Sequence, residues 1–259
     1  MKIPRQSAAA AVLILIFTIS CTHATKHAIE AQNKRRDSIA ALDSVALIKK
    51  MMTADTVTAI EKELIAAGLT DIHTHDTNIR VELKYSTTDN FMKANIYGNL
   101  HKAFLQPDVA EKLLNAQKFL KELHPGYNLI IYDAARPRKY QKALWDSLKV
   151  PASQKGHFVS NPKNGSLHNF GAAVDLSIID EKNKPLDMGC GFDTNDEIAY
   201  PSAETRLLAA GRLTQQQVDN RKLLRTVMYK AGFHNIQTEW WHFNSCTREE
   251  ARAKYKIIE

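Results

Sequence analysis

The chain has 259 residues, of which 44% are hydrophobic and 24% are charged, as is ordinary for a soluble globular protein. This composition excludes a fully disordered chain, a collagen-like repeat and a polytopic membrane protein, and the length provides for one large domain or two small ones. The formal net charge of +7 would suit an anionic partner, but the basic residues are scattered and form no stripe interleaved with aromatic residues. We therefore expect no nucleic-acid partner.

Residues 1–20 have the composition of an export signal. Two basic residues lie within the first five positions, the apolar run 8–19 follows, and the chain then reaches Cys21. The run is too short to cross about 30 Å of hydrocarbon as a helix, which favours a signal peptide. The small residues before Cys21 resemble a bacterial lipoprotein cleavage site, although Thr18 stands where that pattern usually has an aliphatic residue.

We expect lipidation at Cys21, and therefore an exported protein of the periplasm or envelope that acyl chains anchor to the membrane. A plain signal peptide with an incidental cysteine is the alternative. Export would place Cys190 and Cys246 in an oxidising compartment, where a disulfide can persist. The sequence leaves open whether these two cysteines form a bridge or remain separate thiols.

The segment 21–70 is polar and mixed in charge. Stretches 37–52 and 56–67 have helix-forming composition, and Gly68 is a suitable stop. We interpret this segment as a helical tether that lifts a folded domain off a membrane. The domain itself is predicted to cover residues 71–259.

Hydrophobic periodicity predicts the elements of this domain. Alternation of apolar and polar residues indicates strands, whereas apolar residues three and four apart indicate amphipathic helices. In chain order we expect a strand at 79–85, a helix from 107 that ends at Pro125-Gly126, a strand at 128–132, a helix at 139–148, a strand at 172–179, a helix at 221–231 and a strand at 236–243. Because the elements mix without regular βαβ alternation, the pattern favours an α+β fold over a doubly wound sheet.

Metal-ligating residue types lie at the edges of two predicted strands. The segment 166–175, Ser-Leu-His-Asn-Phe-Gly-Ala-Ala-Val-Asp, contains His168 and Asp175, and Glu239-Trp-Trp-His242 adds an imidazole and a carboxylate. His168, Asp175 and His242 would give a metal three protein ligands and an open position, which is the pattern of a catalytic zinc site. Glu239 would then be left without a metal to bind. Zinc lowers the pKa of a bound water to about 7, and a nearby carboxylate such as Glu239 can take the proton of that water.

A third segment, Asp133-Ala-Ala-Arg136-Pro137, follows the predicted strand 128–132. A guanidinium keeps its charge at ordinary pH, so Arg136 suits the stabilisation of a developing oxyanion. The carboxylate of Asp133, three residues earlier, could orient it.

Each segment also has an ordinary structural interpretation. A His-x6-Asp pair can be chance, a Trp-Trp pair is usually core, and an Arg before a Pro is commonly a surface residue. In addition, Glu239 and His242 are three residues apart and would face opposite sides of a regular strand. A common site therefore requires a bulge or a strand end between them.

Five motifs that occur in a fixed order connect these segments. They are Tyr85-Ser-Thr-Thr-Asp89-Asn90-Phe91, Asp133-Ala-Ala-Arg136-Pro137, Ser166-x-His168-x-x-Gly171-x-Ala173-x-Asp175, Met188-Gly189-x-x-Phe192-Asp193 and Glu239-Trp240-Trp241-His242. Together they cover roughly residues 78–245 and resemble the zinc D,D-peptidases, a family that includes vancomycin-resistance enzymes. Within this family the match is to the D-alanyl-D-alanine dipeptidases of VanX type.

The resemblance implies a single zinc D,D-peptidase-like domain, with a small antiparallel sheet flanked by helices. It implies one zinc ion per chain, with His168, Asp175 and His242 as ligands. Glu239 would act as general base and then as general acid, and Arg136 would stabilise the tetrahedral intermediate.

The resemblance also implies how the substrate is held. Tyr85, Asp193 and the ligand Asp175 match positions that hold the free amino end of the substrate, and Ser166 would line the pocket. The sequence departs from the family pattern at 92–93 (Met-Lys) and at 169–170 (Asn-Phe), both of which we expect to alter the pocket rim. The export signal is another departure, because familiar members act in the cytoplasm.

Three functions follow as alternatives. The first is an exported metalloprotease of cell-wall metabolism that hydrolyses D-alanyl-D-alanine or related D,D-dipeptides. The second is a D,D-carboxypeptidase that trims peptidoglycan stem peptides, and the third is a catalytically inactive lipoprotein that binds cell-wall peptide. Asp193 with Tyr85 favours the first, because an anionic cap suits a short substrate with a free ammonium. His73 and His75 could form an extra metal pair, although we favour solvated loop histidines.

Overall fold

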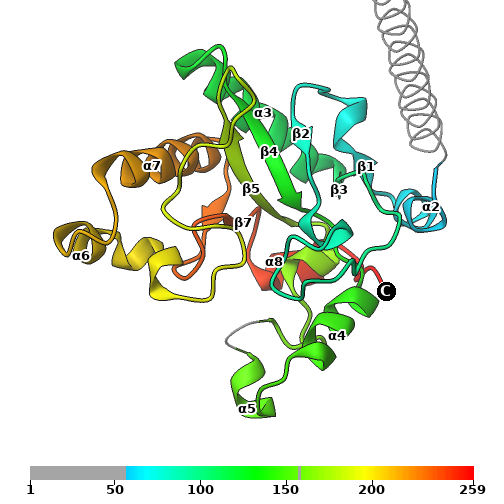
Figure 1. The fold of residues 1–259 in the computed structure, drawn as a ribbon. Coiled ribbons are helices and arrows are strands. Elements are labelled where there is room, and N and C mark those ends of the chain that lie inside the picture. Colours follow the sequence, from blue (N-terminus) through cyan, green and yellow to red (C-terminus); the bar gives the residue numbers. More distant parts are fainter. Residues whose placement is uncertain (1–56, 157–158) are drawn as a thin grey trace, which may run out of the picture. The chain divides into compact units, whose positions relative to one another are not determined.

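The structure is a computed structural model that describes residues 57–156 and 159–259 (Figure 1). The predicted signal peptide, Cys21 and the predicted helix 37–52 lie outside the described residues. Every helix in the described part of the chain is too short or too polar to cross a membrane.

Helix α2 (Ala59–Ala66) belongs to the folded unit, although its sequence was expected to be part of a tether. Thr58 and Glu61 cap the helix reciprocally, and Ile60 and Leu64 are buried in the main core. Burial of this apolar face ties the helix to the domain. The folded unit therefore begins at Val57, earlier than the expected start at residue 71.

A five-stranded sheet with the order β2-β4-β5-β7-β6 forms the centre of the fold. Its strands are β2 (Arg80–Val81), β4 (Asn128–Asp133), β5 (Ala173–Ile179), β6 (His234–Asn235) and β7 (His242–Asn244). A separate pair joins β1 (Thr70–Asp71) to β3 (Phe104–Leu105). The α+β class is confirmed, and the central sheet is antiparallel except where β2 pairs with β4 in parallel. The chain from β2 to β4 passes through helix α3, and a long crossover of this kind permits parallel pairing.

The longer helices follow the predicted periodicity. Helix α3 (Pro107–Leu123) contacts β4 and also helix α7 (Gln215–Lys230), and Figure 1 shows both helices beside the central strands. Helix α7 begins earlier than predicted, because Thr214 caps it in a box with Gln217. The remaining helical elements are η1 (Ile72–Thr74), η2 (Lys84–Ser86), α4 (Arg138–Ser147), α5 (Ala152–Lys155), η3 (Leu167–Phe170), η4 (Glu197–Ala199), η5 (Pro201–Ala203), α6 (Glu204–Ala209) and α8 (Arg248–Lys254).

Two predicted strands are shorter than expected, and in both cases the chain bends where the prediction has a strand. The prediction of a strand at 79–85 is wrong beyond Val81, because the chain turns into η2 and buries Tyr85. The prediction at 236–243 is wrong over 236–241, which is a bend between β6 and β7. The side-chain amide of Asn235 holds this bend by donating to the carbonyls of Glu239 (2.9 Å) and His242 (2.7 Å). The aromatic residues that suggested a strand here are instead packed in the core.

Candidate functional site

The short helix η3 places His168 beside the sheet. Ser166 precedes η3, and its hydroxyl accepts a hydrogen bond from the backbone N–H of His168 at 3.3 Å. The helix ends at Gly171, whose φ of +65° is left-handed and whose Cβ, if present, would lie 2.8 Å from Leu69. Glycine is therefore required for the chain to turn directly into β5.

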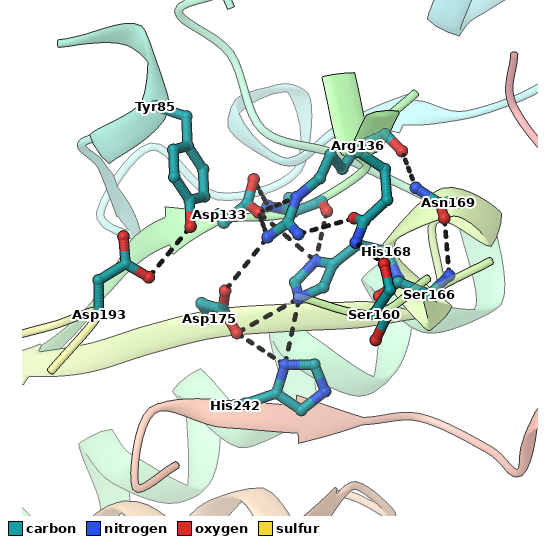
Figure 2. Close-up of polar contacts among 12 residues, drawn as sticks. Tyr85, Asp133, Arg136, Ser160, Ser166, His168, Asn169, Asp175, Asp193 and His242 are labelled. Atoms are coloured by element: carbon teal, nitrogen blue, oxygen red, sulfur yellow. Dashed lines mark hydrogen bonds and ion pairs between the residues drawn. The ribbon is translucent and has the colours of Figure 1, made fainter. Parts of the chain in front are cut away.

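Strands β5 and β7 bring two further ligand types to the same point. Asp175 and His242 are direct neighbours in the antiparallel pairing of β5 with β7, and Figure 2 shows both side chains pointing at His168. His242 Nδ1 lies 2.9 Å from Asp175 Oδ1 and 3.2 Å from His168 Nε2, and His168 Nε2 lies 3.3 Å from Asp175 Oδ1. These three atoms form a nearly equilateral triangle.

This triangle has the size and chemistry of a zinc site. Two ligand atoms held tetrahedrally by zinc at about 2.0–2.2 Å lie roughly 3.3–3.6 Å apart, so the observed edges need only a small expansion. The outer ring nitrogens are already engaged, His168 Nδ1 with the carbonyl of Ala134 at 2.7 Å and His242 Nε2 with Asn244 Oδ1 at 2.8 Å. Because those outer nitrogens donate, the inner nitrogens present lone pairs. Two lone pairs and a carboxylate oxygen thus converge on one point, and they could hold a metal ion.

The electrostatics of the cluster favour a cation at this point. Burial raises the pKa of Asp175, but the His168 and His242 imidazoles overcome this effect and hold it far below its usual range. Burial lowers the pKa of His242, whereas its hydrogen bond to Asp175 and the charge of that residue raise it to about 9. Both shifts have the same cause, the close approach of the Asp175 carboxylate to two imidazoles, and this arrangement favours a positive charge between them.

Glu239 lies next to the cluster without being part of it. Its Oε2 is 3.9 Å from His242 Nδ1, and about a third (34%) of its side chain remains exposed. The bend 236–241 ends where β7 begins at His242, so the two side chains need not alternate across a strand. This strand end resolves the geometric difficulty that the sequence posed. Burial raises the pKa of Glu239 above its usual value.

Arg136 is buried beside the cluster and is held by Asp133. Its Nε donates to Asp133 Oδ2 at 2.9 Å, its Nη2 donates to the same oxygen, and its Nη2 lies 3.9 Å from Asp175 Oδ2. Burial lowers the pKa of Arg136, but Asp133 overcomes this and raises it well above its usual value. The guanidinium is therefore a fixed positive charge facing the cluster.

Asp193 and Tyr85 form a second polar pair across the cavity. The phenol of Tyr85 donates to Asp193 Oδ1 at 3.0 Å, while Asp193 Oδ2 is buried and has no hydrogen-bond partner among the described residues. Burial, and then the nearby charge of Asp175, raise the pKa of Asp193 to about 8. The charge of a cationic ligand group would favour the ionised form of Asp193, so this unpaired oxygen is suited to accept a hydrogen bond from such a group.

A cavity of about 190 Å³ unites the predicted residues. Its wall includes Tyr85, Arg136, Ser166, His168, Asp175, Asp193, Glu239 and His242. Asp133 lies behind Arg136 and is fully buried. Five motifs that are far apart in the sequence therefore meet around one small space.

Several residues around the site were missed by the sequence analysis. Tyr97 donates to Asp133 Oδ1 at 2.7 Å, Gln141 accepts from Arg136, and Asn244 orients His242. None of them lies in one of the five motifs. Asn169 was expected to alter the pocket rim, but it is fully buried and donates to the backbone carbonyl of Arg136 at 2.6 Å.

Other candidates lie apart from the site or are separate from one another. Among the described residues, His168, Asp175 and His242 are the group that could hold a metal, whereas His73 and His75 bond separately to the carbonyl of Ile79 and the hydroxyl of Thr70. Among the residues that the structure describes, Cys190 and Cys246 are free thiols and do not bridge each other.

The fold and this cavity define the class of the protein: two histidines and an aspartate converge beside a free carboxylate and a guanidinium, as in a mononuclear metallohydrolase. The family model described as D-ala-D-ala dipeptidase matches residues 65–257. The chain belongs to this family of metallopeptidases.

Two relatives that are named as dipeptidases agree with this assignment. The D-alanyl-D-alanine dipeptidase of Escherichia coli is 34% identical over 175 residues, which is 68% of this chain and 83% of that protein. The D-alanyl-D-alanine dipeptidase of Enterococcus faecium is 26% identical, over 64% of this chain and 85% of its own. Among solved structures, the LdcB LD-carboxypeptidase is 21% identical with a TM-score of 0.35, and covers 58% of this chain and 63% of its own.

Proposed function

We propose that this protein is a zinc dipeptidase that hydrolyses D-alanyl-D-alanine or a closely related D,D-dipeptide in cell-wall metabolism. One observation carries the proposal: a single small cavity holds the metal-type cluster, a free carboxylate, a fixed guanidinium and an unpaired buried carboxylate oxygen. The relatives named as D-alanyl-D-alanine dipeptidases support the choice of substrate.

His168, Asp175 and His242 would hold the zinc ion. When bound, zinc supplies Lewis acidity, which polarises a carbonyl and makes water a stronger acid near neutral pH. Ala134 and Asn244 fix the two imidazoles in the tautomers that present lone pairs to the ion.

Glu239 is the residue that we assign to proton transfer. It borders the cavity near His242, and its carboxylate has no hydrogen-bond partner among the described side chains that would restrain it. It would accept the proton of the attacking water and then donate a proton to the departing amine. Its raised pKa brings it closer to neutrality and so suits both steps.

Arg136 would stabilise the negative charge that develops on the oxygen of the scissile carbonyl. Because its position is fixed before the reaction, its charge requires little reorganisation in the transition state. Asp133 keeps the guanidinium in place from behind, and it lies outside the wall of the cavity.

Asp193 and Tyr85 would select a substrate with a free amino end. Asp193 Oδ2 is available for an α-ammonium, and Asp175 adds negative charge nearby. Ser166 lies in the same wall and would border the bound dipeptide. A blocked amino end would leave the Asp193 carboxylate buried without its partner, which is costly.

The experiment compares three substrates of the purified protein: D-Ala-D-Ala, its N-acetylated form and a stem pentapeptide that ends in D-Ala-D-Ala. We expect rapid release of D-Ala from the free dipeptide alone. Comparable rates on the blocked dipeptide or the pentapeptide would instead identify a D,D-carboxypeptidase. Failure to cleave any of the three would support the binding-protein alternative.

We also propose that the protein is exported and anchored through a lipid on Cys21. The support for this is the sequence of residues 1–21: a basic start, a short apolar run and small residues before the cysteine.

A further inference from the structure

The hydrogen bonds of Arg136 are unevenly distributed around its guanidinium. Nε and Nη2 both donate to the same atom, Asp133 Oδ2. The other oxygen, Asp133 Oδ1, is already engaged by the phenol of Tyr97 at 2.7 Å and the backbone N–H of Ala134 at 2.9 Å. The ion pair therefore contacts one carboxylate oxygen and lacks the two-point fork that fixes a guanidinium in a plane.

A single acceptor atom can serve as a pivot. The phenol oxygen of Tyr97 accepts from Nε at 3.2 Å, but this contact lies at the same end of the guanidinium. The far end, Nη1, has one hydrogen-bond partner within the described part of the chain, Gln141 Oε1 at 2.9 Å. Gln141 thus provides the second fixed point that the carboxylate does not.

Gln141 is itself held in place. It lies on helix α4, its side chain is fully buried, and its Nε2 donates to the backbone carbonyl of Ser160 at 2.8 Å. Because the amide nitrogen is committed to Ser160, the amide oxygen must face Arg136. Ser160 belongs to the wall of the cavity, so Gln141 links the guanidinium to that wall.

We propose that Gln141 is a positioning residue for the reaction: it fixes the rotation of the Arg136 guanidinium, so that its donors point at the oxygen that develops negative charge. This inference rests on the proposed function. Gln141 does not line the cavity and need not touch the substrate, so its effect is exerted through Arg136. Its loss affects the transition state more than the bound substrate.

Three variants of the zinc-loaded full chain test this inference. Gln141→Met keeps the length of the side chain and removes both hydrogen bonds, whereas Gln141→Glu keeps an acceptor for Arg136 and loses the donor to Ser160. A matched control is Gln117→Met in helix α3, because Gln117 is also a buried glutamine with two hydrogen bonds, to Asn128 and Leu129. The control therefore loses the same number of side-chain hydrogen bonds, but at a place away from the cavity.

We expect Gln141→Met to lower kcat about 10- to 100-fold, because the Arg136 donor that faces the oxyanion becomes misaligned. The KM for D-Ala-D-Ala should change less than about threefold. Affinity for a tetrahedral phosphinate analogue of the dipeptide, measured by calorimetry, falls by the same factor as kcat/KM. Gln141→Glu keeps kcat within a few-fold of wild type. Gln117→Met lowers the melting temperature without this loss of kcat.

Several results would overturn the inference while the proposed function stands. They are wild-type kcat in Gln141→Met, a rise in KM with unchanged kcat, or equal losses in Gln141→Met and Gln141→Glu. If Gln141→Met does not fold, Gln141→Asn takes its place, because the shorter side chain withdraws the amide oxygen from Arg136. An unchanged kcat in Gln141→Asn would also overturn the inference. An inactive wild-type protein would instead refute the proposed function.

Discussion

Replacing Glu239 by Gln separates catalysis from metal binding and from folding. The substitution keeps the shape of the side chain and removes its ability to accept a proton. General acid–base transfer contributes about 10²–10⁴-fold, so the barrier for hydrolysis should rise by about 2.7–5.4 kcal/mol. The free energy of unfolding should change by less than about 0.5 kcal/mol, because the side chain is partly exposed and no described side chain hydrogen-bonds to it.

The pH dependence gives an independent reading of the same residue. Burial raises the pKa of Glu239, and the base must be ionised to accept a proton, so wild-type kcat/KM should fall as the pH drops through that raised pKa. In Glu239→Gln this acidic limb should disappear from the residual activity.

The assay combines D-Ala release with elemental analysis and thermal unfolding of both proteins. We expect a large loss of turnover, an unchanged zinc content and a similar melting temperature. Wild-type turnover in the variant would show that Glu239 is not the base. Loss of zinc would show that Glu239 is a ligand, and would refute the distinction drawn here between the cluster and its free carboxylate.

Four further predictions concern the metal, the amino end, the titration of Asp193 and the anchor. His168→Ala should lose most of its zinc by elemental analysis, because one of three ligands is gone, whereas the exposed control His101→Ala should keep it; full occupancy in His168→Ala would remove the ligand assignment. Wild type should prefer the free over the N-acetylated dipeptide by on the order of 10⁴-fold, and Asp193→Asn should reduce this ratio by roughly 10–100-fold; an unchanged ratio would exclude Asp193 as the ammonium partner. The fold raises the pKa of Asp193 to about 8, so the stability that its protonated form contributes is present below pH 3.8 and lost as the pH rises to about 8. Chemical denaturation should therefore show Asp193→Asn gaining stability over wild type between these values, and a gap that does not grow with pH would contradict the shift. Labelled fatty acid should enter the wild type but not Cys21→Ser, and equal labelling would exclude the anchor.

Much of the fold was predictable from periodicity, because long elements bury one face. The helix at 107–123 and the strands at 128–132 and 172–179 occur as expected. The bend at 236–241 was not predictable in this way, because Trp240 and Trp241 are buried for packing, and aromatic composition alone cannot distinguish a strand from a packed turn.

Eight residues of the cavity wall were named from the sequence, either as metal-ligand and acid–base residue types or through the family resemblance. The residues that hold them were not. Gln141 and Tyr97 act through tertiary contacts with Arg136, and a Gln in a helix or a Tyr in a loop has many ordinary uses. Only the folded chain shows which hydrogen bonds they make.

The central claim is that one metal ion held by His168, Asp175 and His242 makes this protein a dipeptidase. The most direct measurement titrates zinc into chelator-stripped full-length protein and follows both bound metal and the rate of D-Ala release from D-Ala-D-Ala. The stripped protein should be inactive, and the rate should rise in proportion to bound zinc and level off at one equivalent per chain. Full activity in the stripped protein, or zinc binding without any hydrolysis of the dipeptide, would contradict the claim.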